Sequence, residues 1–270
     1  MVKYKRPLFT YPGGKYRFLS NIIPLVPKCK RFIDVFAGGL SVSINVDRDE
    51  HIINDIESEL INVYRFIKDD KDRYIDAIKP LFSEEYNTRE MFLNVRQRYN
   101  KSTDLFEKAT LLLYLNKNTY RGMLRYNSKG EFNTAPKITK NTKSIDKLIF
   151  DINNTHELLK KSELFSLDYS EIFNMIRPGD VVYCDPPYLN EDNSVYRNKF
   201  GYQQHVKLRD LAVNSNQTVI ISNAYNEKTL DLYKDANIFV IDGKWSFCPT
   251  GTSTQKEIVA IFNQQFSYTL

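Results

Sequence analysis

Residues 31–39 read RFIDVFAGG and decide the expected fold of this chain. Arg31–Ala37 is a short run of β-type residues, and a pair of glycines follows it as a turn. Residues 40–46 (LSVSINV) suit a helix, and His51–Asp55 (HIIND) is a second short strand that ends in an acid. We therefore predict a strand, a glycine turn, a helix and a strand, the unit with which an α/β sheet begins.

A helical block replaces this alternation from about Glu57 to Asn118. Apolar residues recur in it at helical spacing, and no strand signal interrupts it. The block leads into a mixed run and then into Asn127–Gly130 (NSKG), which favours a hairpin turn. We therefore predict an inserted helical domain over residues 57–144, with a hairpin at about residues 120–135.

The α/β alternation resumes after a helix near Ser144–Lys161. The remaining apolar runs predict strands at Leu164–Leu167, Asp180–Cys184, Thr218–Ser222, Asn237–Ile241 and Glu257–Phe262. Helical spacing predicts helices near Tyr169–Met175, Gln203–Ser215 and Asn226–Asp235. Residues 1–56 and 145–270 are therefore expected to form one discontinuous α/β domain, a Rossmann-like sheet with helices on both faces.

Composition limits the class of protein. The chain has 270 residues, of which 42% are apolar, enough for one large or two smaller domains. No apolar run approaches the ~18 residues of a membrane span, and the first residues lack a signal peptide's apolar core. The cysteines and histidines are isolated, at Cys29, Cys184, Cys248, His51, His156 and His205. We therefore expect a cytoplasmic protein without a bound metal or disulfides.

Positive charge is concentrated in one segment. Arg89–Lys143 contains twelve Lys and Arg against four Asp and Glu, a balance of +8, so the remainder carries −3 of the net charge of +5. Such asymmetry indicates a polyanion-binding segment attached to a more acidic body, although a solvated helical face is the alternative. Because aromatic residues are interleaved with the cations, we favour nucleic acid as the partner.

The tetrapeptide Asp185-Pro186-Pro187-Tyr188 follows the apolar run 181–184 (VVYC). Two prolines hold the chain rigid there, at the carboxyl end of a predicted strand, where open α/β sheets bind ligands. A carboxylate and a backbone carbonyl can accept both hydrogens of an amino group, and the ring can stack on a flat substrate. The alternative is a proline turn with an incidental aspartate.

Three further patterns are compatible with an adenosine cofactor. Asp55 lies 21 positions after Asp34, close to where an acid that binds ribose is expected. Only two glycines end the first strand, so a cofactor without phosphates is favoured over a dinucleotide. Residues 11–15 (YPGGK) form either a flap over a ligand or a plain turn. Asp168 either binds an adenine amino group or caps the next helix.

These motifs, in this order, resemble the DNA adenine-N6 methyltransferases of the Dam type, the alpha group of the D12 class. The resemblance rests on YPGGK at 11–15, DVFAGG at 34–39, Asn54-Asp55 and DPPY at 185–188. Residues 113–127 (LYLNKNTYRGMLRYN) and 130–133 (GEFN) are similar to the family's DNA-recognition hairpin, as is ISN at 221–223 to a late-strand motif. Together they cover nearly the whole chain.

The resemblance implies a class I methyltransferase sheet that uses S-adenosylmethionine and releases S-adenosylhomocysteine. By the family's pattern, the cofactor contacts are Tyr11, Lys15, Asp55 and Asp185, and the same pocket is lined by Asp34, Phe36, Gly38 and Asp168. The catalytic group is Asp185, Pro186, Pro187 and Tyr188. Asp185 and the Pro186 carbonyl would hold the amino group of a flipped adenine, on which Tyr188 would stack. The loop Leu189–Tyr202, with Tyr196 and Phe200, would close over it.

The same resemblance implies that residues 57–144 recognise double-stranded DNA. Arg125 is expected to read a guanine edge, Met123 a thymine methyl, and Tyr120 to enter the base stack. The other expected DNA contacts are Arg121, Asn127 and Lys129. Relatives often have Asn or Ser at position 121, some have Lys at position 10 where this chain has Thr10, and Ala135 replaces a hairpin proline. GATC is therefore the expected target only by resemblance.

Two other functions remain open from the sequence. The tetrapeptide also suits methylation of an RNA adenine or a protein amide, and a catalytically inactive DNA-binding relative would keep the same fold. The expected assembly is a monomer or weak dimer. High usage of Asn, Lys, Ile and Tyr is typical of an AT-rich genome, such as that of a phage or a low-GC bacterium.

Overall fold

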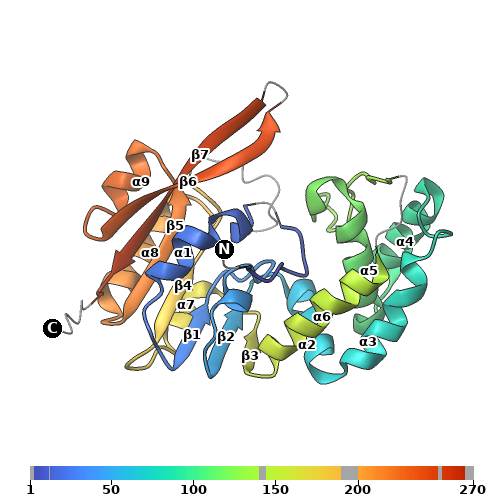
Figure 1. The fold of residues 1–270 in the computed structure, drawn as a ribbon, viewed down its shortest axis with the longest axis horizontal. Helices are drawn as coiled ribbons and strands as arrows, with labels where there is room; N and C mark the ends of the chain where they lie inside the picture. Colours follow the sequence, from blue (N-terminus) through green and yellow to red (C-terminus); the bar gives the residue numbers. More distant parts are fainter. Residues whose placement is uncertain (1–2, 12, 140–143, 190–199, 249–250, 265–270) are drawn as a thin grey trace.

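The computed structural model of the protein describes residues 3–11, 13–139, 144–189, 200–248 and 251–264, with residues 244–248 and 251–255 described as backbone only. Figure 1 shows a twisted sheet with helices against it and a group of helices beyond one sheet edge. Within the described residues no helix is long and apolar enough to cross a membrane.

The sheet has the strand order β3-β2-β1-β4-β5-β7-β6. Its strands are β1 (Arg31–Asp34), β2 (Glu50–Asn54), β3 (Ser162–Phe165), β4 (Val181–Cys184), β5 (Thr218–Ala224), β6 (Asn237–Cys248) and β7 (Gly251–Phe262). The pairs among β1 to β5 are parallel, and β7 is antiparallel to both β5 and β6. Because the strand order reverses between β1 and β4, their carboxyl ends form a switch point, where such sheets bind ligands.

Both faces of the sheet are covered. The helices against it are η1 (Lys15–Phe18), α1 (Leu19–Ile22), η2 (Ile23–Leu25), η3 (Ser43–Asn45), α7 (Tyr169–Phe173), α8 (Tyr202–Asn214) and α9 (Glu227–Leu232). On one face Ile172 and Leu208 pack with Val182, and on the other Phe18 and Leu19 pack in the cluster of Tyr183. Strands β1 and β4 are buried along their whole length, as a central parallel strand requires.

A second core lies within the helices beyond β3 (Figure 1). These helices are α2 (Ser58–Asp69), α3 (Lys71–Ile78), η4 (Lys79–Phe82), α4 (Arg89–Lys101), α5 (Leu105–Asn118), η5 (Tyr120–Gly122) and α6 (Ile145–Leu159). Residues Leu111–Leu115 of α5 are all buried, so this helix is the centre of the group. The N-terminal residues Leu8 and Phe9 belong to the same core although they precede β1.

A hairpin-like loop follows η5. Antiparallel bridges join Thr119 to Pro136 and Tyr126 to Phe132. The Asn127 side chain closes the turn by accepting from the backbone N–H of Lys129 and of Glu131. The loop is held to α4 because Asn100 accepts from the Phe132 N–H and donates to the Phe132 carbonyl.

The strand and helix predictions are confirmed except at residues 40–46. All seven predicted strands are present, with β6 and β7 longer than expected, and the predicted helical block contains helices throughout. The helix predicted over residues 40–46 is wrong: only the three-residue η3 forms. Leu40 has a left-handed φ of 67°, and the Ser43 hydroxyl is drawn to the Asp34 carboxylate, so the segment follows the end of β1.

Candidate active site

The switch point places two acidic motifs side by side. Asp34 ends β1 and lies in register with Tyr183 of β4, two residues before Asp185. The Val35 N–H donates to the Tyr183 carbonyl at 3.0 Å and continues the pairing beyond β1. Residues that are 150 positions apart in the chain are therefore brought to one edge of the sheet.

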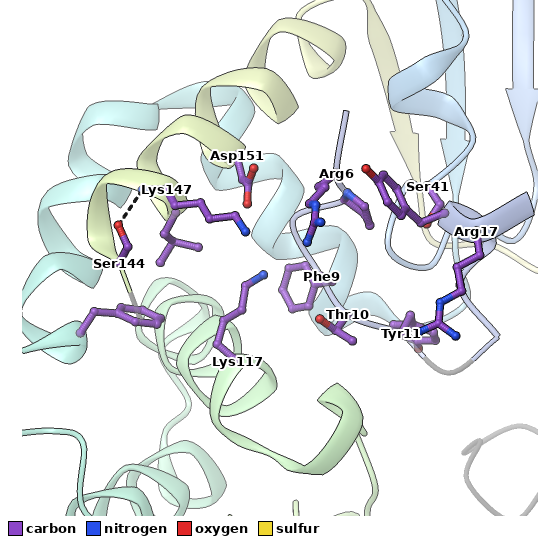
Figure 2. Close-up of a pocket in the computed structure, with 15 residues that line it drawn as sticks. Arg6, Phe9, Thr10, Tyr11, Arg17, Ser41, Lys117, Ser144, Lys147 and Asp151 are labelled. Carbon is purple, nitrogen blue, oxygen red and sulfur yellow. Dashed lines mark hydrogen bonds between the residues drawn. The ribbon is translucent and has the colours of Figure 1, made fainter. Parts of the chain in front are cut away.

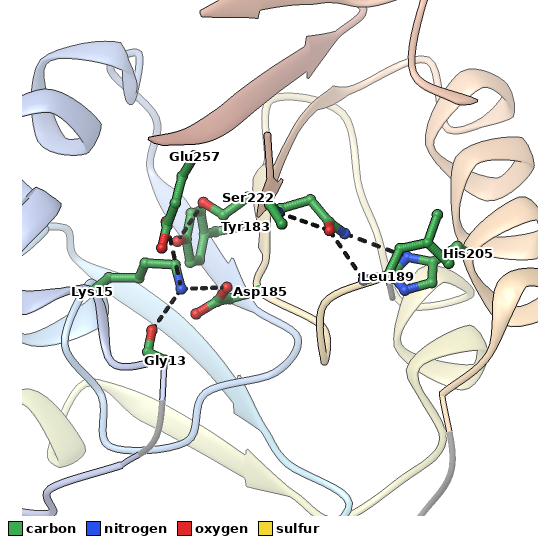
Figure 3. A network of polar contacts seen from close by, with 10 residues as sticks. Gly13, Lys15, Tyr183, Asp185, Leu189, His205, Ser222 and Glu257 are labelled. Carbon is green, nitrogen blue, oxygen red and sulfur yellow. Dashed lines mark hydrogen bonds and ion pairs between the residues drawn. The ribbon is translucent and has the colours of Figure 1, made fainter. Parts of the chain in front are cut away.

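Lys15 is the centre of a buried ionic cluster at this edge (Figure 3). Its Nζ lies 2.8 Å from Asp185 Oδ1 and 3.9 Å from Glu257 Oε2, and it donates to the Gly13 carbonyl at 2.6 Å. The ammonium also lies 4.6 Å from the centre of the Tyr188 ring. The Lys15 side chain is only 2% exposed, and a buried charge of this kind is stable only with such partners.

Glu257 on β7 is the second carboxylate of the cluster. Its side chain is 3% exposed. Burial raises the pKa of Glu257, while Lys15 and Tyr188 lower it. Burial, together with the Asp185 and Glu257 charges, holds the pKa of the Tyr188 hydroxyl well above its usual range. The Tyr188 phenol is therefore neutral and serves as a ring and a hydroxyl, not as a base.

Asp34 and Asp55 add two further buried carboxylates. Asp34 accepts from the Ser43 hydroxyl through Oδ2, while its buried Oδ1 has no hydrogen-bond partner within the described residues. Burial raises the pKa of Asp34 to about 7, and the Asp185 and Asp55 charges add to this. Asp55 accepts from the N–H groups of Gly38 at 2.8 Å and Glu57 at 3.0 Å. Burial raises its pKa as well, which these two bonds oppose.

This composition fits a cationic, phosphate-free cofactor. Four acidic side chains, of Asp34, Asp55, Asp185 and Glu257, surround one ammonium group, so a positively charged ligand is favoured and a pyrophosphate is not. The buried Asp34 Oδ1 also lacks the donor that a cofactor ammonium group would supply.

Gly38 makes a close approach possible at the strand end. Its φ is +45°, and an added Cβ would lie 3.5 Å from the Tyr11 ring. Its carbonyl accepts from the buried Tyr64 hydroxyl at 2.6 Å. The Tyr11 ring therefore covers the glycine turn, and residues Tyr11 and Lys15 of the predicted flap both lie at the switch point.

A neutral network supports the loop after the tetrapeptide (Figure 3). Asn223 Oδ1 on β5 accepts from the Leu189 N–H at 3.2 Å, and the Asn223 amide lies 3.5 Å from His205 Nδ1. The Tyr233 hydroxyl lies 3.1 Å from the same nitrogen. Burial lowers the pKa of His205 to about 4, so its ring is neutral. The network fixes the path of the chain as it leaves Tyr188.

Aromatic rings line the other side of the strand end. Phe36 stacks on Tyr169 with ring centres 5.7 Å apart, and Phe200 meets Phe36 edge-on at 5.5 Å. Asp168 is exposed and accepts from the Ser170 N–H at 3.0 Å, so it caps α7. Its cofactor contact stays a prediction, as does loop closure over the pocket, because Tyr196 lies outside the described residues.

The predicted DNA contacts lie along η5 and the hairpin-like loop. Tyr120, Arg121, Arg125 and Lys129 are exposed, while Met123 and Asn127 are half-buried. Arg125 Nε donates to Asn133 Oδ1 at 2.9 Å, which orients its guanidinium. Arg121 has a left-handed φ of 56°. Asn127 uses its side chain to close the turn, so it shapes the loop in addition to any contact with DNA.

A junction joins this loop to the N-terminal segment. The buried Asn116 side chain accepts from the Thr10 N–H at 3.1 Å and donates to the carbonyls of Thr10 at 2.8 Å and Gly122 at 2.7 Å. Gly122 has a φ of +67°, and an added Cβ would lie 2.5 Å from the Thr10 carbonyl oxygen. Only glycine fits this contact. Thr10 adjoins Tyr11, so the loop and the flap are mechanically connected.

Sequence reasoning missed Glu257, His205 and Asn116 as site residues. Glu257 was assigned only to a strand, His205 was taken as an isolated histidine, and Asn116 was quoted only within a motif. Each is a polar residue inside an apolar run or helix, and that is the one local signal it carries. No group of three or more potential metal ligands occurs among the residues with described placement.

The strand order and the antiparallel β7 are those of a class I methyltransferase fold. Residues 11–247 match the family model described as D12 class N6 adenine-specific DNA methyltransferase, and the chain belongs to this family. It is accordingly an adenine-specific DNA methyltransferase.

Relatives with the same description extend over nearly the whole chain. The DNA adenine methylase of Escherichia coli K12 is 32% identical over 97% of this chain and 96% of its own length. That of Serratia marcescens is 31% identical, over 97% and 100%, and that of Vibrio cholerae O395 28%, over 98% and 99%. A solved chain described as a conserved hypothetical protein from Streptococcus pyogenes aligns over 90% of this chain and 93% of its own, with a TM-score of 0.32 and 12% identity, which is too weak to carry an argument.

Proposed function

We propose that the protein transfers a methyl group from S-adenosylmethionine to N6 of an adenine flipped out of duplex DNA, within GATC. The observation that carries this proposal is the contact of Lys15 with Asp185 inside a group of four acidic side chains at the switch point. Its charge suits a sulfonium, and its position suits an adenosine cofactor bound at the carboxyl ends of β1 and β2.

The cofactor would be held by residues of the two strand ends and the flap. Asp55 would bind the ribose, and Asp34 Oδ1 would accept from the ammonium group of the methionine part. Tyr11 and Phe36 would cover the two sides, with Lys15 and Gly38 between them. The buried, unpaired Asp34 Oδ1 and the close approach at Gly38 support this assignment.

The tetrapeptide would then present the nucleophile. The exocyclic nitrogen of adenine is a poor nucleophile because its lone pair is delocalised into the ring. The Asp185 carboxylate and the Pro186 carbonyl would accept its two hydrogens and direct the lone pair toward the methyl group. The cofactor supplies an electrophilic methyl on a sulfonium and leaves as neutral S-adenosylhomocysteine. As the N–C bond forms and the C–S bond breaks, Asp185 would take the proton that N6 loses.

DNA would be read by the segment from Tyr120 to Lys129. The exposed, oriented Arg125 supports a bidentate contact to guanine, and the exposed Tyr120 ring supports entry into the stack beside the flipped base. We propose that the protein acts in the cytoplasm of a bacterium or of a phage-infected host, as a monomer or weak dimer.

Radiolabelled S-adenosylmethionine tests the function directly. The protein is incubated with duplexes that contain GATC, a permuted site, or the GATC sequence as RNA, and label is sought in N6-methyladenine. We expect label in the GATC duplex only. Asp185→Ala should lose transfer and still bind DNA, while Asp168→Ala should transfer label at a measurable rate. Absence of label from every DNA would overturn the proposal.

A further inference from the structure

A second cleft lies apart from the candidate active site (Figure 2). It has a volume of about 680 Å³ and lies between the N-terminal segment and helices α5 and α6. Its lining includes Arg6, Arg17, Lys117 and Lys147, and the only acid among its lining residues is Asp151. The lining therefore carries a net charge of +3, the reverse of the acidic cofactor site.

The cations converge on one region of the cleft. Figure 2 shows the charged ends of Arg6, Lys117 and Lys147 directed into the space beside Asp151. Asp151 is only 7% exposed. Burial raises its pKa, and the charges of these three cations lower it. Asp151 thus offsets the mutual repulsion of the cations and keeps them gathered at one place before an anion arrives.

Folding, not sequence clustering, builds this site. Only Lys117 belongs to the basic segment Arg89–Lys143. Arg6 and Arg17 come from the N-terminal segment, and Lys147 from the first turn of α6. Lys117 also donates to the Leu8 carbonyl, which fixes the N-terminal segment against α5.

The cleft adjoins both working parts of the enzyme. Tyr11 and Gly14 line it and immediately flank the flap whose Lys15 contacts Asp185. Thr10 lines it as well and is bonded to Asn116 at the junction with Gly122. A strand that reached from the predicted reading loop to the flipped base would therefore pass this cleft.

We propose that the cleft binds the phosphodiester backbone of the DNA, through Arg6, Lys117 and Lys147. This inference rests on the proposed function, since it assumes a duplex bound across the reading loop and the flap. Two of the three cations, Arg6 and Lys147, are exposed, and the space exceeds what one phosphate ion needs, which suits a continuous chain of phosphates. Phosphate contacts position DNA without reading its sequence.

Salt dependence of DNA binding tests the assignment. The dissociation constant of a GATC duplex is measured by fluorescence anisotropy at several salt concentrations, with S-adenosylhomocysteine present. Lys147→Ala and Arg6→Ala should each weaken binding of GATC and permuted duplexes alike. Each should also reduce the slope of log K against log salt by about 1, and the double variant by about 2.

Matched variants and a second ligand separate the outcomes. Lys147→Arg should keep the wild-type slope, and so should Lys160→Ala, which removes an exposed lysine at the other end of α6. An unchanged slope in Lys147→Ala and Arg6→Ala, with wild-type methyl transfer intact, would overturn only this inference. So would calorimetric binding of inorganic phosphate that Lys147→Ala abolishes without changing the DNA slope. If the wild type binds DNA with the expected slopes but transfers no methyl group, the proposed function fails instead.

Discussion

At the scale of single residues, the main feature is that Lys15 has two carboxylate partners. Asp185 is the nearer at 2.8 Å, and Glu257 is next at 3.9 Å. In the proposed reaction Asp185 must accept a hydrogen from adenine, which competes with its bond to Lys15. Glu257 offers the ammonium a second acceptor within a short movement, so the buried charge need not be left unpaired when adenine enters.

Glu257→Gln should therefore slow methyl transfer without abolishing DNA binding. The amide keeps the shape and removes the charge, so Lys15 stays on Asp185. Because a hydrogen bond to a charged group contributes about 1.5–3 kcal/mol, we expect a roughly 10- to 100-fold lower single-turnover rate. Glu107→Gln, which alters an exposed pair with Arg98, is the control. A wild-type rate in Glu257→Gln would rule out this role.

Asp34 makes stability depend on pH. Its pKa is about 7 in the folded protein and 3.8 in an exposed chain, so the folded state holds the proton more tightly. The contribution is therefore full below the lower value and is lost as the pH rises through the higher one, by at most about 1.4 kcal/mol per pH unit. Asp34→Asn should become more stable relative to wild type as the pH rises through this window, as measured by urea unfolding without cofactor.

The control for Asp34 has the opposite sign. Lys161 lowers the pKa of the exposed Asp47, whose stabilising effect is present at high pH and lost as the pH falls through its folded pKa. Asp47→Asn should therefore lose a little stability relative to wild type at high pH. If the stability difference between Asp34→Asn and wild type did not change with pH, a raised Asp34 pKa would be refuted.

At the scale of elements, the sequence was sufficient wherever local pattern and burial agree. The strands β1 and β4 are buried on both faces, and their uninterrupted apolar runs identified them. Residues 40–46 were misassigned because their apolar spacing is helical, whereas contacts from Asp34 to Ser43 and from Asn45 to Lys5 set the local path. Those contacts come from elsewhere in the chain and leave no local pattern.

The site was predictable to the same extent. Tyr11, Lys15, Asp34 and Asp55 lie in short motifs, so their types and spacing could be recognised. Glu257, His205 and the cations Arg6 and Lys147 act through partners distant in sequence, and only the strand order brings them there. Asn116 is typical of this second group, since 106 positions separate it from its partner Thr10.

At the scale of the whole molecule, the N-terminal segment connects the two cores. Leu8 and Phe9 are buried with the helices around α5, whereas Lys15 is buried at the end of the sheet. Between them, Thr10 is bonded to Asn116, which also holds Gly122 at the start of the reading loop. A movement of that loop on DNA would therefore be transmitted to Tyr11 and Lys15. Such a connection predicts that DNA and cofactor bind cooperatively.

Asn116→Ala should weaken that cooperativity. We expect DNA to raise cofactor affinity about 5- to 150-fold in the wild type, the usual range for coupled sites, and several-fold less in the variant. Calorimetric titration of S-adenosylhomocysteine with and without a GATC duplex measures the factor. Asn100→Ala is the matched control, because Asn100 holds Phe132 of the same loop to α4 and has no bond to the N-terminal segment. It should weaken DNA binding but keep the coupling factor. Equal coupling in all three proteins would show that the junction transmits nothing, even if Asn116→Ala lowered the melting temperature.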